Sequence, residues 1–202
     1  MKQQILVIHG GDNFATYKKY LSFLKKFRID FEYYKSDRKS WKRNLTKNLG
    51  RNYEVILPEM PNKFNAKYLE WKIWFEKLIP YIKPKAIFVG HSLGGTFLVK
   101  YLSENKFSKN IKATFLVAAC FNSDGLDDPL LDFEPPKNIS SFKDQAGQIF
   151  IYHSQDDKVV PVSHAKKFQK VLPKAKLTIL KNRGHFNQEK IPELIKDLKN
   201  KK

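Results

Sequence analysis

Serine, aspartate and histidine, which together can form an activated serine nucleophile, occur in that order along this 202-residue chain. Ser92 lies in a G-x-S-x-G pattern at residues 90–94, and the adjacent Asp156 and Asp157 and then His185 follow downstream. A serine hydroxyl is a weak nucleophile until a base takes its proton, and histidine has a suitable pKa for this near neutrality. A buried carboxylate then holds the histidine tautomer and stabilises the imidazolium. We therefore interpret Ser92 as a nucleophile, His185 as its base, and Asp157, with Asp156 as a competitor, as the acid.

The context of Ser92 favours a nucleophile over a serine that occurs in a turn by chance. A continuous apolar run from Ala86 to Val89 predicts a buried strand, and helical spacing begins directly after Ser92. In such a strand–turn–helix connection the serine backbone is strained, and Gly90 and Gly94 approach their neighbours too closely for side chains. The N-terminal amides of the following helix favour negative charge beside Ser92.

The tetrahedral intermediate of such a reaction carries an oxyanion that needs backbone N–H donors. The amide of Leu93, next to the nucleophile, is one expected donor. We expect the second donor at Gly11, in the loop that follows the first strand. His9 is expected to hydrogen-bond the loop backbone behind this oxyanion hole, and His91 to shape the pocket beside Ser92.

Elements that could position these residues alternate along the chain. Apolar runs predict strands over 5–9, 53–57, 86–90, 111–119, 148–152 and 176–180, with a short edge strand over 29–33. Helical spacing predicts helices over 15–27 (capped by Asn13), 36–49, 66–82 (with Trp71 and Trp74 in the core), 93–105, 161–172 and 191–198.

This alternation predicts one α/β domain over residues 1–202, with a mostly parallel, doubly wound sheet of about six strands flanked by helices. The carboxyl ends of the strands lie at one edge of such a sheet, so Ser92, Asp157 and His185 are expected to meet there. Residues 122–147 are rich in prolines and acids and predict a loop or small lid within the domain, over the strand ends.

Four elements in this order resemble the α/β-hydrolase superfamily over nearly the whole chain: residues 9–11 (HGG), residues 90–95 (GHSLGG), residues 157–161 (DKVVP) and residues 184–186 (GHF). The resemblance implies an α/β-hydrolase fold with a minimal cap. It also implies a serine hydrolase that cleaves a small-molecule carboxylic ester, or a small amide or thioester, through an acyl-enzyme.

Two details of the resemblance concern the choice of catalytic acid and the branch of the superfamily. In such hydrolases the Asp-x-x-Val-Pro spacing begins at the catalytic acid, which favours Asp157 over Asp156. The small size, the absence of a large cap and the Met-Pro-Asn segment at residues 60–62 resemble the compact serine hydrolases similar to retinoblastoma-binding protein nine.

The formal net charge of +18 raises the alternative of a nucleic-acid or anionic-surface partner. The lysines occur along the whole chain and no nucleic-acid-binding motif is visible, which favours ordinary solvated faces. The most basic neighbourhood is residues 18–47, where we expect any anionic partner to bind. Two other functions stay open: a hydrolase-fold interaction module that uses this basic face, and acyl transfer to an alcohol.

Other sequence features limit the environment and the cofactors. No stretch approaches the roughly 18 apolar residues that a membrane span needs, and the N-terminal apolar run is too short for a signal peptide. The single cysteine, Cys120, excludes an internal disulfide, so we expect a cytoplasmic protein. No cluster has the spacing of metal ligands, and no glycine-rich phosphate loop is visible, so no cofactor or metal is expected.

Overall fold

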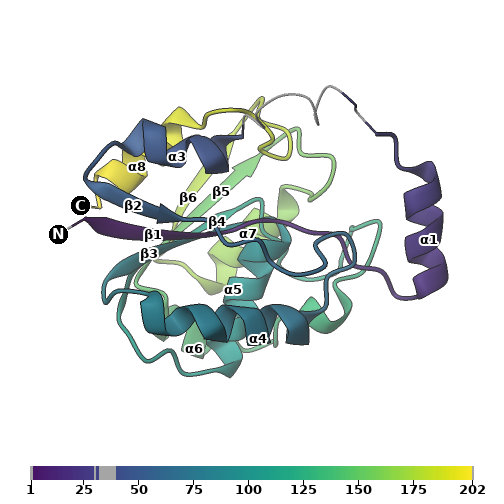
Figure 1. Cartoon of the computed structure of the whole chain (residues 1–202), viewed down its shortest axis with the longest axis horizontal. Helices are drawn as coiled ribbons and strands as arrows, with labels where there is room; N and C mark the ends of the chain where they lie inside the picture. The colour runs from purple at the N-terminus through teal and green to yellow at the C-terminus, as the bar shows by residue number, and fades with distance from the viewer. Residues whose placement is uncertain (1, 30, 32–39, 202) are drawn as a thin grey trace.

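A six-stranded, entirely parallel sheet with the order β2-β1-β3-β4-β5-β6 runs through the middle of the molecule (Figure 1). The computed structural model describes residues 2–29, 31 and 40–201. The strands are β1 (Gln3–Ile8), β2 (Tyr53–Ile56), β3 (Ala86–His91), β4 (Ile111–Val117), β5 (Gln148–Ser154) and β6 (Lys176–Leu180). Strand order reverses between β1 and β3, and in open sheets this reversal opens a crevice at the carboxyl ends.

Helices and short 3₁₀ turns connect the strands. They are α1 (Tyr17–Lys26), α3 (Trp41–Leu49), α4 (Tyr68–Leu78), η1 (Ile79–Tyr81), α5 (Leu93–Glu104), η2 (Leu131–Phe133), α6 (Ser140–Gln145), α7 (Ser163–Val171) and α8 (Pro192–Lys199). The predicted mostly parallel, doubly wound sheet of about six strands is confirmed.

Two hydrophobic clusters cover the two faces of the sheet. Because successive side chains point to opposite faces, Leu6 and Ile8 join one cluster while Ile5 and Val7 join the other. The first cluster packs against α4, α5, α6 and α7, through buried side chains such as Trp71, Phe97, Phe142 and Phe168. The second cluster packs against α3 and α8, through Trp41, Leu45, Leu194 and Leu198.

Two predicted details differ from the structure. Asn13 does not cap α1; the Thr16 hydroxyl accepts a hydrogen bond from the Lys19 amide instead. The buried Asn13 amide donates to the carbonyls of Pro129 and Leu130, at 3.1 and 2.8 Å. Trp74 was expected in the core but is 45% exposed, because α4 turns Trp71 and Phe75 toward the sheet.

Two further predictions concern the N-terminal part of the chain. Most of the edge strand expected over 29–33, namely residues 30, 32 and 33, lies outside the described residues. The first residues of the helix expected over 36–49, residues 36–39, also lie outside them, and the described helix begins at Trp41. Within the described part of the chain, no helix is long and apolar enough to cross a bilayer.

Residues 122–147, where we expect a loop or small lid, contain η2 and α6. The ring of Phe133 is fully buried and lies 5.2 Å from that of Trp71. The carboxylate of Asp132 accepts a 2.8 Å hydrogen bond from the first amide of α4. Together with Asn13, these contacts fasten the first half of the segment to α4 and to the loop after β1.

Candidate active site

Ser92 lies at the turn between β3 and α5 with backbone angles φ 53° and ψ −126°. Such a positive φ is strained for a residue other than glycine. The Ser92 amide donates to the carbonyl of Val117 at the end of β4, and the Ser92 carbonyl accepts from Gly95 in the first turn of α5. Its hydroxyl makes no capping hydrogen bond to α5. The neighbouring strand and helix thus hold the strained backbone, and the hydroxyl is not used to cap the helix.

The glycines around Ser92 are required by close packing, as the sequence predicts. A Cβ added to Gly90 would lie 2.4 Å from the Gly95 Cα. A Cβ on Gly94 would lie 2.4 Å from the carbonyl oxygens of Ile8 and His9. Real Cβ atoms do not approach so closely, so α5 can start directly behind β1 and β3 only with glycine at these positions.

Asp157 and His185 form a hydrogen-bonded pair in the loops after β5 and β6. Asp157 Oδ2 lies 2.9 Å from His185 Nδ1, and Asp157 Oδ1 accepts from the amides of Val159 and Val160 at 2.9 and 3.0 Å. Burial raises the pKa of the Asp157 carboxyl, but the hydrogen bond and charge of His185 and the two amides outweigh it and lower the pKa below its ordinary value. The carboxylate is therefore ionised at neutral pH.

Asp156, the competitor for the acid role, points elsewhere. Its Oδ1 accepts from the Ser154 hydroxyl and from the amides of Arg183 and Gly184, at 3.2 and 3.0 Å for the amides. These contacts join the β5 loop to the β6 loop just before His185. Asp156 thus braces the loop that carries the histidine, and among the hydrogen bonds and ion pairs of the described residues none joins its carboxylate to the His185 ring.

A buried cluster supports the backbone of the His185 loop. His91 Nε2 lies 2.9 Å from the carbonyl oxygen of His185, and His91 Nδ1 lies 3.3 Å from Lys42 Nζ. The indole of Trp41 donates to the carbonyl of Phe186 at 2.8 Å. Since the ammonium of Lys42 can only donate, His91 accepts at Nδ1 and donates from Nε2 to His185.

Burial sets the charge state of this cluster. It lowers the pKa of His91 well below its usual value, and the charges of Lys42 and His185 act in the same direction. Burial also lowers the pKa of Lys42 to about 8. His91 therefore stays neutral beside the lysine.

Trp41 and Lys42 are not among the site residues expected from the sequence. Trp41, Leu45 and Leu49 are the buried residues of α3 and have helical spacing, which could have identified α3 as a packed helix. No local signal indicates that its first turn reaches a loop about 145 residues away.

The loop after β1 lies directly against Ser92. A Cβ added to Gly10 would lie 3.0 Å from Ser92 Cβ. His9 Nε2 accepts from the Met60 amide at 2.8 Å, so Nδ1 carries the proton and donates to the Gly10 carbonyl at 2.6 Å. The expectation that His9 holds loop backbone is thus confirmed.

The two amides expected to form the oxyanion hole make no hydrogen bond within the described part of the chain. In the part of the chain that the structure describes, the amides of Gly11 and Leu93 have no protein acceptor, whereas the next loop amide, that of Asp12, donates to the Lys63 carbonyl. Gly11 belongs to the loop that lies against Ser92, and Leu93 follows Ser92 directly. Among the hydrogen bonds of the described residues, none joins the Ser92 hydroxyl to His185, a contact that often forms fully only with substrate bound.

The remaining cysteine and histidines of the described chain have inert or supporting positions. Among the described residues, no group of three His, Cys, Asp or Glu side chains could hold a metal ion. Burial raises the pKa of the Cys120 thiol to about 12, so it stays protonated. His153 Nε2 donates to the Val160 carbonyl at 2.8 Å and lies 3.7 Å from Asp157 Oδ2, so His153 supports the loop that carries Asp157. His164 accepts from the Phe121 amide at 3.0 Å and holds backbone in the same way.

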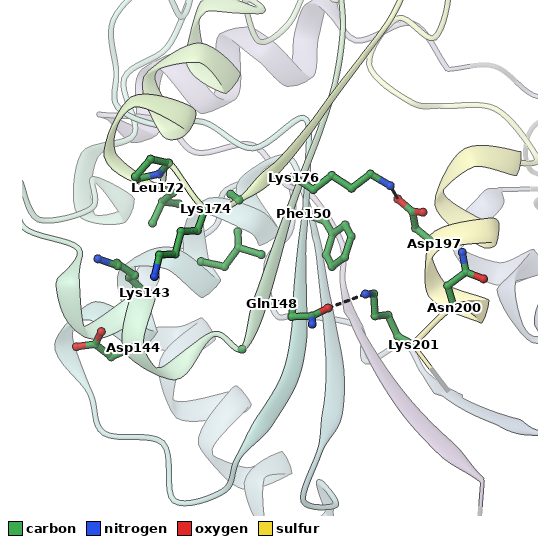
Figure 2. Close-up of a pocket in the computed structure, with 14 residues that line it drawn as sticks. Lys143, Asp144, Gln148, Phe150, Leu172, Lys174, Lys176, Asp197, Asn200 and Lys201 are labelled. Carbon is green, nitrogen blue, oxygen red and sulfur yellow. Dashed lines mark hydrogen bonds and ion pairs between the residues drawn. The ribbon is translucent and has the colours of Figure 1, made fainter.

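A cavity of about 600 Å³ lies at the opposite edge of the sheet. It opens at Gln148 and Lys176, the first residues of β5 and β6, beside the buried ring of Phe150. Figure 2 shows Lys176 paired with Asp197, and Lys201 paired with Gln148, around that ring. None of the residues expected at the catalytic site lines this cavity, so we do not associate it with Ser92.

Comparison with known proteins supports the fold and the hydrolase class. The family model described as serine hydrolase matches residues 31–192. The ydeN gene product from B. subtilis has a TM-score of 0.72 at 19% sequence identity, covering 99% of this chain and 98% of that chain. Est1E from Butyrivibrio proteoclasticus has a TM-score of 0.62 at 14% identity, covering 98% and 86%.

A third solved structure, the CarC serine hydrolase involved in carbazole degradation, has a TM-score of 0.62 at 16% identity, covering 98% of this chain and 90% of that chain. At such identities these likenesses show the fold alone. No curated protein matches the chain. The expected α/β-hydrolase fold is confirmed, while the branch similar to retinoblastoma-binding protein nine stays a prediction.

Proposed function

Because this chain belongs to the serine hydrolase family, we propose that it cleaves a carboxylic ester through an acyl-enzyme formed on Ser92, with His185 as base and Asp157 as acid. The observation that carries the proposal is the 2.9 Å contact between Asp157 Oδ2 and His185 Nδ1. That pair lies on the loops after β5 and β6. The His185 carbonyl accepts a hydrogen bond from His91, the residue before Ser92.

In the acylation step, His185 Nε2 takes the proton of the Ser92 hydroxyl while the oxygen attacks the ester carbonyl carbon. The oxyanion that forms accepts hydrogen bonds from the amides of Gly11 and Leu93, whose lack of protein acceptors supports this role. His185 then gives its proton to the departing alcohol. Water, activated by the same histidine, attacks the acyl-enzyme and releases the acid, which returns Ser92 to its starting state.

The same steps fit a small amide or a thioester, and an alcohol in place of water would give acyl transfer. We propose that residues 122–147 form part of the wall over the acyl or alcohol group. The two hydrogen bonds from Asn13 support this, because they fasten Pro129 and Leu130 to the loop that carries Gly11.

Steady-state hydrolysis of p-nitrophenyl esters of increasing acyl length tests the proposal. Ser92→Ala is expected to remove turnover, and Asp157→Asn to lower kcat by about 10³-fold or more, because the histidine tautomer is no longer held. Asp156→Asn is the matched control, because it removes a neighbouring carboxylate of the same size. It is expected to reduce kcat less than about 10-fold, since Asp156 acts through the loop backbone. Turnover that survives Ser92→Ala, or equal losses in both aspartate variants, would contradict the assignment.

A further inference from the structure

The helix α1 differs from the other long helices of the described chain in how it is packed. None of its ten residues, all of which the structure describes, is buried. By contrast, α3, α4, α5, α7 and α8 each bury part of one face against the sheet. Figure 1 shows α1 set apart from the sheet and the other helices, beyond the carboxyl ends of the strands. A helix that buries no face gains little from packing.

The sequence of α1 is nevertheless amphipathic. Its apolar residues recur at helical spacing on one side, and they are Tyr17, Tyr20, Leu21, Phe23 and Leu24. The inner part of this side rests on Phe14, whose ring lies 5.7 Å from Tyr20 and 5.0 Å from Phe23. The outer stripe faces solvent: Tyr17 is 69%, Leu21 38% and Leu24 42% exposed.

The charges of this region have one sign. Between Asn13 and Ile29 the sequence has no acidic residue, while it has the five cations Lys18, Lys19, Lys25, Lys26 and Arg28. In α1 the lysines lie beside and opposite the apolar stripe. The region therefore combines an exposed apolar stripe with a border of positive charge.

We propose that α1 is an interfacial helix that binds the surface of an anionic lipid bilayer. An amphipathic helix of this kind lies in the plane of the interface, with its apolar stripe between the headgroups and its lysines beside the phosphates. The spread of lysines over the chain favours solvated faces in general. The helix α1 differs because its exposed apolar stripe is bordered by cations without any acid, whereas α4, which also exposes Leu69 and Ile73, contains Glu70 and Glu76.

The same features argue against two other occupants. A nucleic acid would neutralise the lysines but leave Tyr17, Leu21 and Leu24 in water. A second copy of the chain would cover the stripe but place five cations against five cations. A bilayer surface satisfies both features.

Binding through α1 would also bring the candidate active site to the membrane. The short loop from Gly11 to Thr16 joins α1 to the part of the chain that lies against Ser92. The carboxyl edge of the sheet would then face the bilayer. The membrane proposal does not depend on catalysis, but it fits an ester substrate that partitions into lipid.

Sedimentation with lipid vesicles tests this proposal on the full chain. We expect the wild-type protein to bind vesicles of phosphatidylcholine with about one quarter phosphatidylglycerol, and not vesicles of phosphatidylcholine alone. Leu21→Ser with Leu24→Ser is expected to weaken binding by about 10-fold or more. Lys18→Gln with Lys25→Gln is expected to weaken it to a similar extent.

Two matched pairs of substitutions serve as controls. Leu69→Ser with Ile73→Ser removes two exposed apolar side chains of α4, which are 63% and 49% exposed. Lys106→Gln with Lys166→Gln removes two exposed lysines far from α1 in the sequence. Both pairs are expected to leave vesicle binding unchanged. Circular dichroism and hydrolysis of a short soluble ester check that all four variants fold.

The proposal is overturned if the wild-type protein does not bind the anionic vesicles, or if the α1 and control pairs lose binding equally. It is also overturned if only the lysine substitutions in α1 weaken vesicle binding, because binding would then be purely electrostatic and the apolar stripe would not contribute. A dimer in analytical ultracentrifugation that disappears in the Leu21 and Leu24 variant would assign α1 to a subunit interface instead.

Discussion

Among individual residues, Lys42 has the least expected position, because a lysine ammonium lies 3.3 Å from a neutral, buried histidine next to the nucleophile. Through His91 it reaches the carbonyl of His185, and its neighbour Trp41 reaches Phe186. The base of the proposed mechanism is thus held from two sides: its side chain by Asp157 and its backbone by His91. We assign Lys42 a positioning role.

Replacing Lys42 by methionine is expected to change how stability depends on pH. The pKa of Lys42 is about 8 in the folded chain and 10.5 ordinarily, so between these values the unfolded chain holds a proton that the folded chain has released. Stability from this group therefore rises with pH across that window. Urea unfolding of both proteins should show the wild type gaining stability relative to Lys42→Met as pH rises above 8. A difference that does not vary with pH would contradict the partly buried position of the ammonium.

The proposed catalytic side chains can be predicted from the sequence, but the residues that support them, Trp41 and Lys42, cannot. Ser92 is predicted from its own neighbours, because the elbow needs glycines at fixed offsets. Asp157 and His185 are predicted because they lie in the segments that follow two apolar runs, in the order Ser, Asp, His along the chain. The contacts of Trp41 and Lys42 depend on how α3 packs against β2 and α8, which no local pattern encodes.

At the scale of elements, the turn from β3 to α5 requires two other strands beside it. β1 and the residue after it supply the Ile8 and His9 carbonyls against Gly94, and β4 supplies the Val117 carbonyl that accepts from Ser92. The strained conformation of Ser92 persists because these neighbours determine it from both sides.

Gly94→Ala is expected to destabilise the fold by about 3 kcal/mol, because the added methyl meets two backbone oxygens that cannot move separately from β1. Gly50→Ala is a control for backbone strain alone: an added Cβ there meets nothing within 4 Å, but φ 85° with ψ −177° is a conformation that only glycine adopts readily. The control is expected to cost about 2 kcal/mol. Chemical denaturation measures both, and a Gly94 variant as stable as the Gly50 variant would refute the packing argument.

Element boundaries could be predicted where the signal is local. The strand over 176–180 and the helix from Leu93 agree with the structure within a residue. Asn13 shows where local reasoning fails: it has a suitable residue type and position for a helix cap, but its side chain bonds Pro129 and Leu130 instead. Trp74 fails similarly, since one helix face is too narrow to bury every aromatic residue of α4.

For the whole molecule, the fold class follows from the alternation of strands and helices. Which face of the sheet each helix covers does not follow from it. In the structure α3 and α8 pack on the same face of the sheet, and α1 buries no residue. The net charge of +18 acts at this scale too, because like charges repel throughout the folded chain. Ion pairs such as Arg43–Glu59, with side chains 52% and 72% exposed, offset little of this repulsion.

Salt is therefore expected to stabilise this protein. Raising sodium chloride from about 20 mM to about 300 mM shortens the screening length and should raise Tm by a few degrees. The effect should be smaller in Lys106→Gln with Lys166→Gln, which carries two fewer positive charges. Thermal unfolding followed by circular dichroism measures the shift. A Tm that stays constant or falls with salt would show that favourable ion pairs outweigh the repulsion.

The central claim is that Ser92 is an activated nucleophile, and covalent labelling tests it most directly. A fluorophosphonate probe should react with the wild-type protein, and peptide mass spectrometry should locate the adduct on Ser92. Ser92→Ala should not be labelled, and Asp157→Asn should be labelled much more slowly than Asp156→Asn. Folded wild-type protein that resists the probe, or an adduct on another residue, would contradict the account.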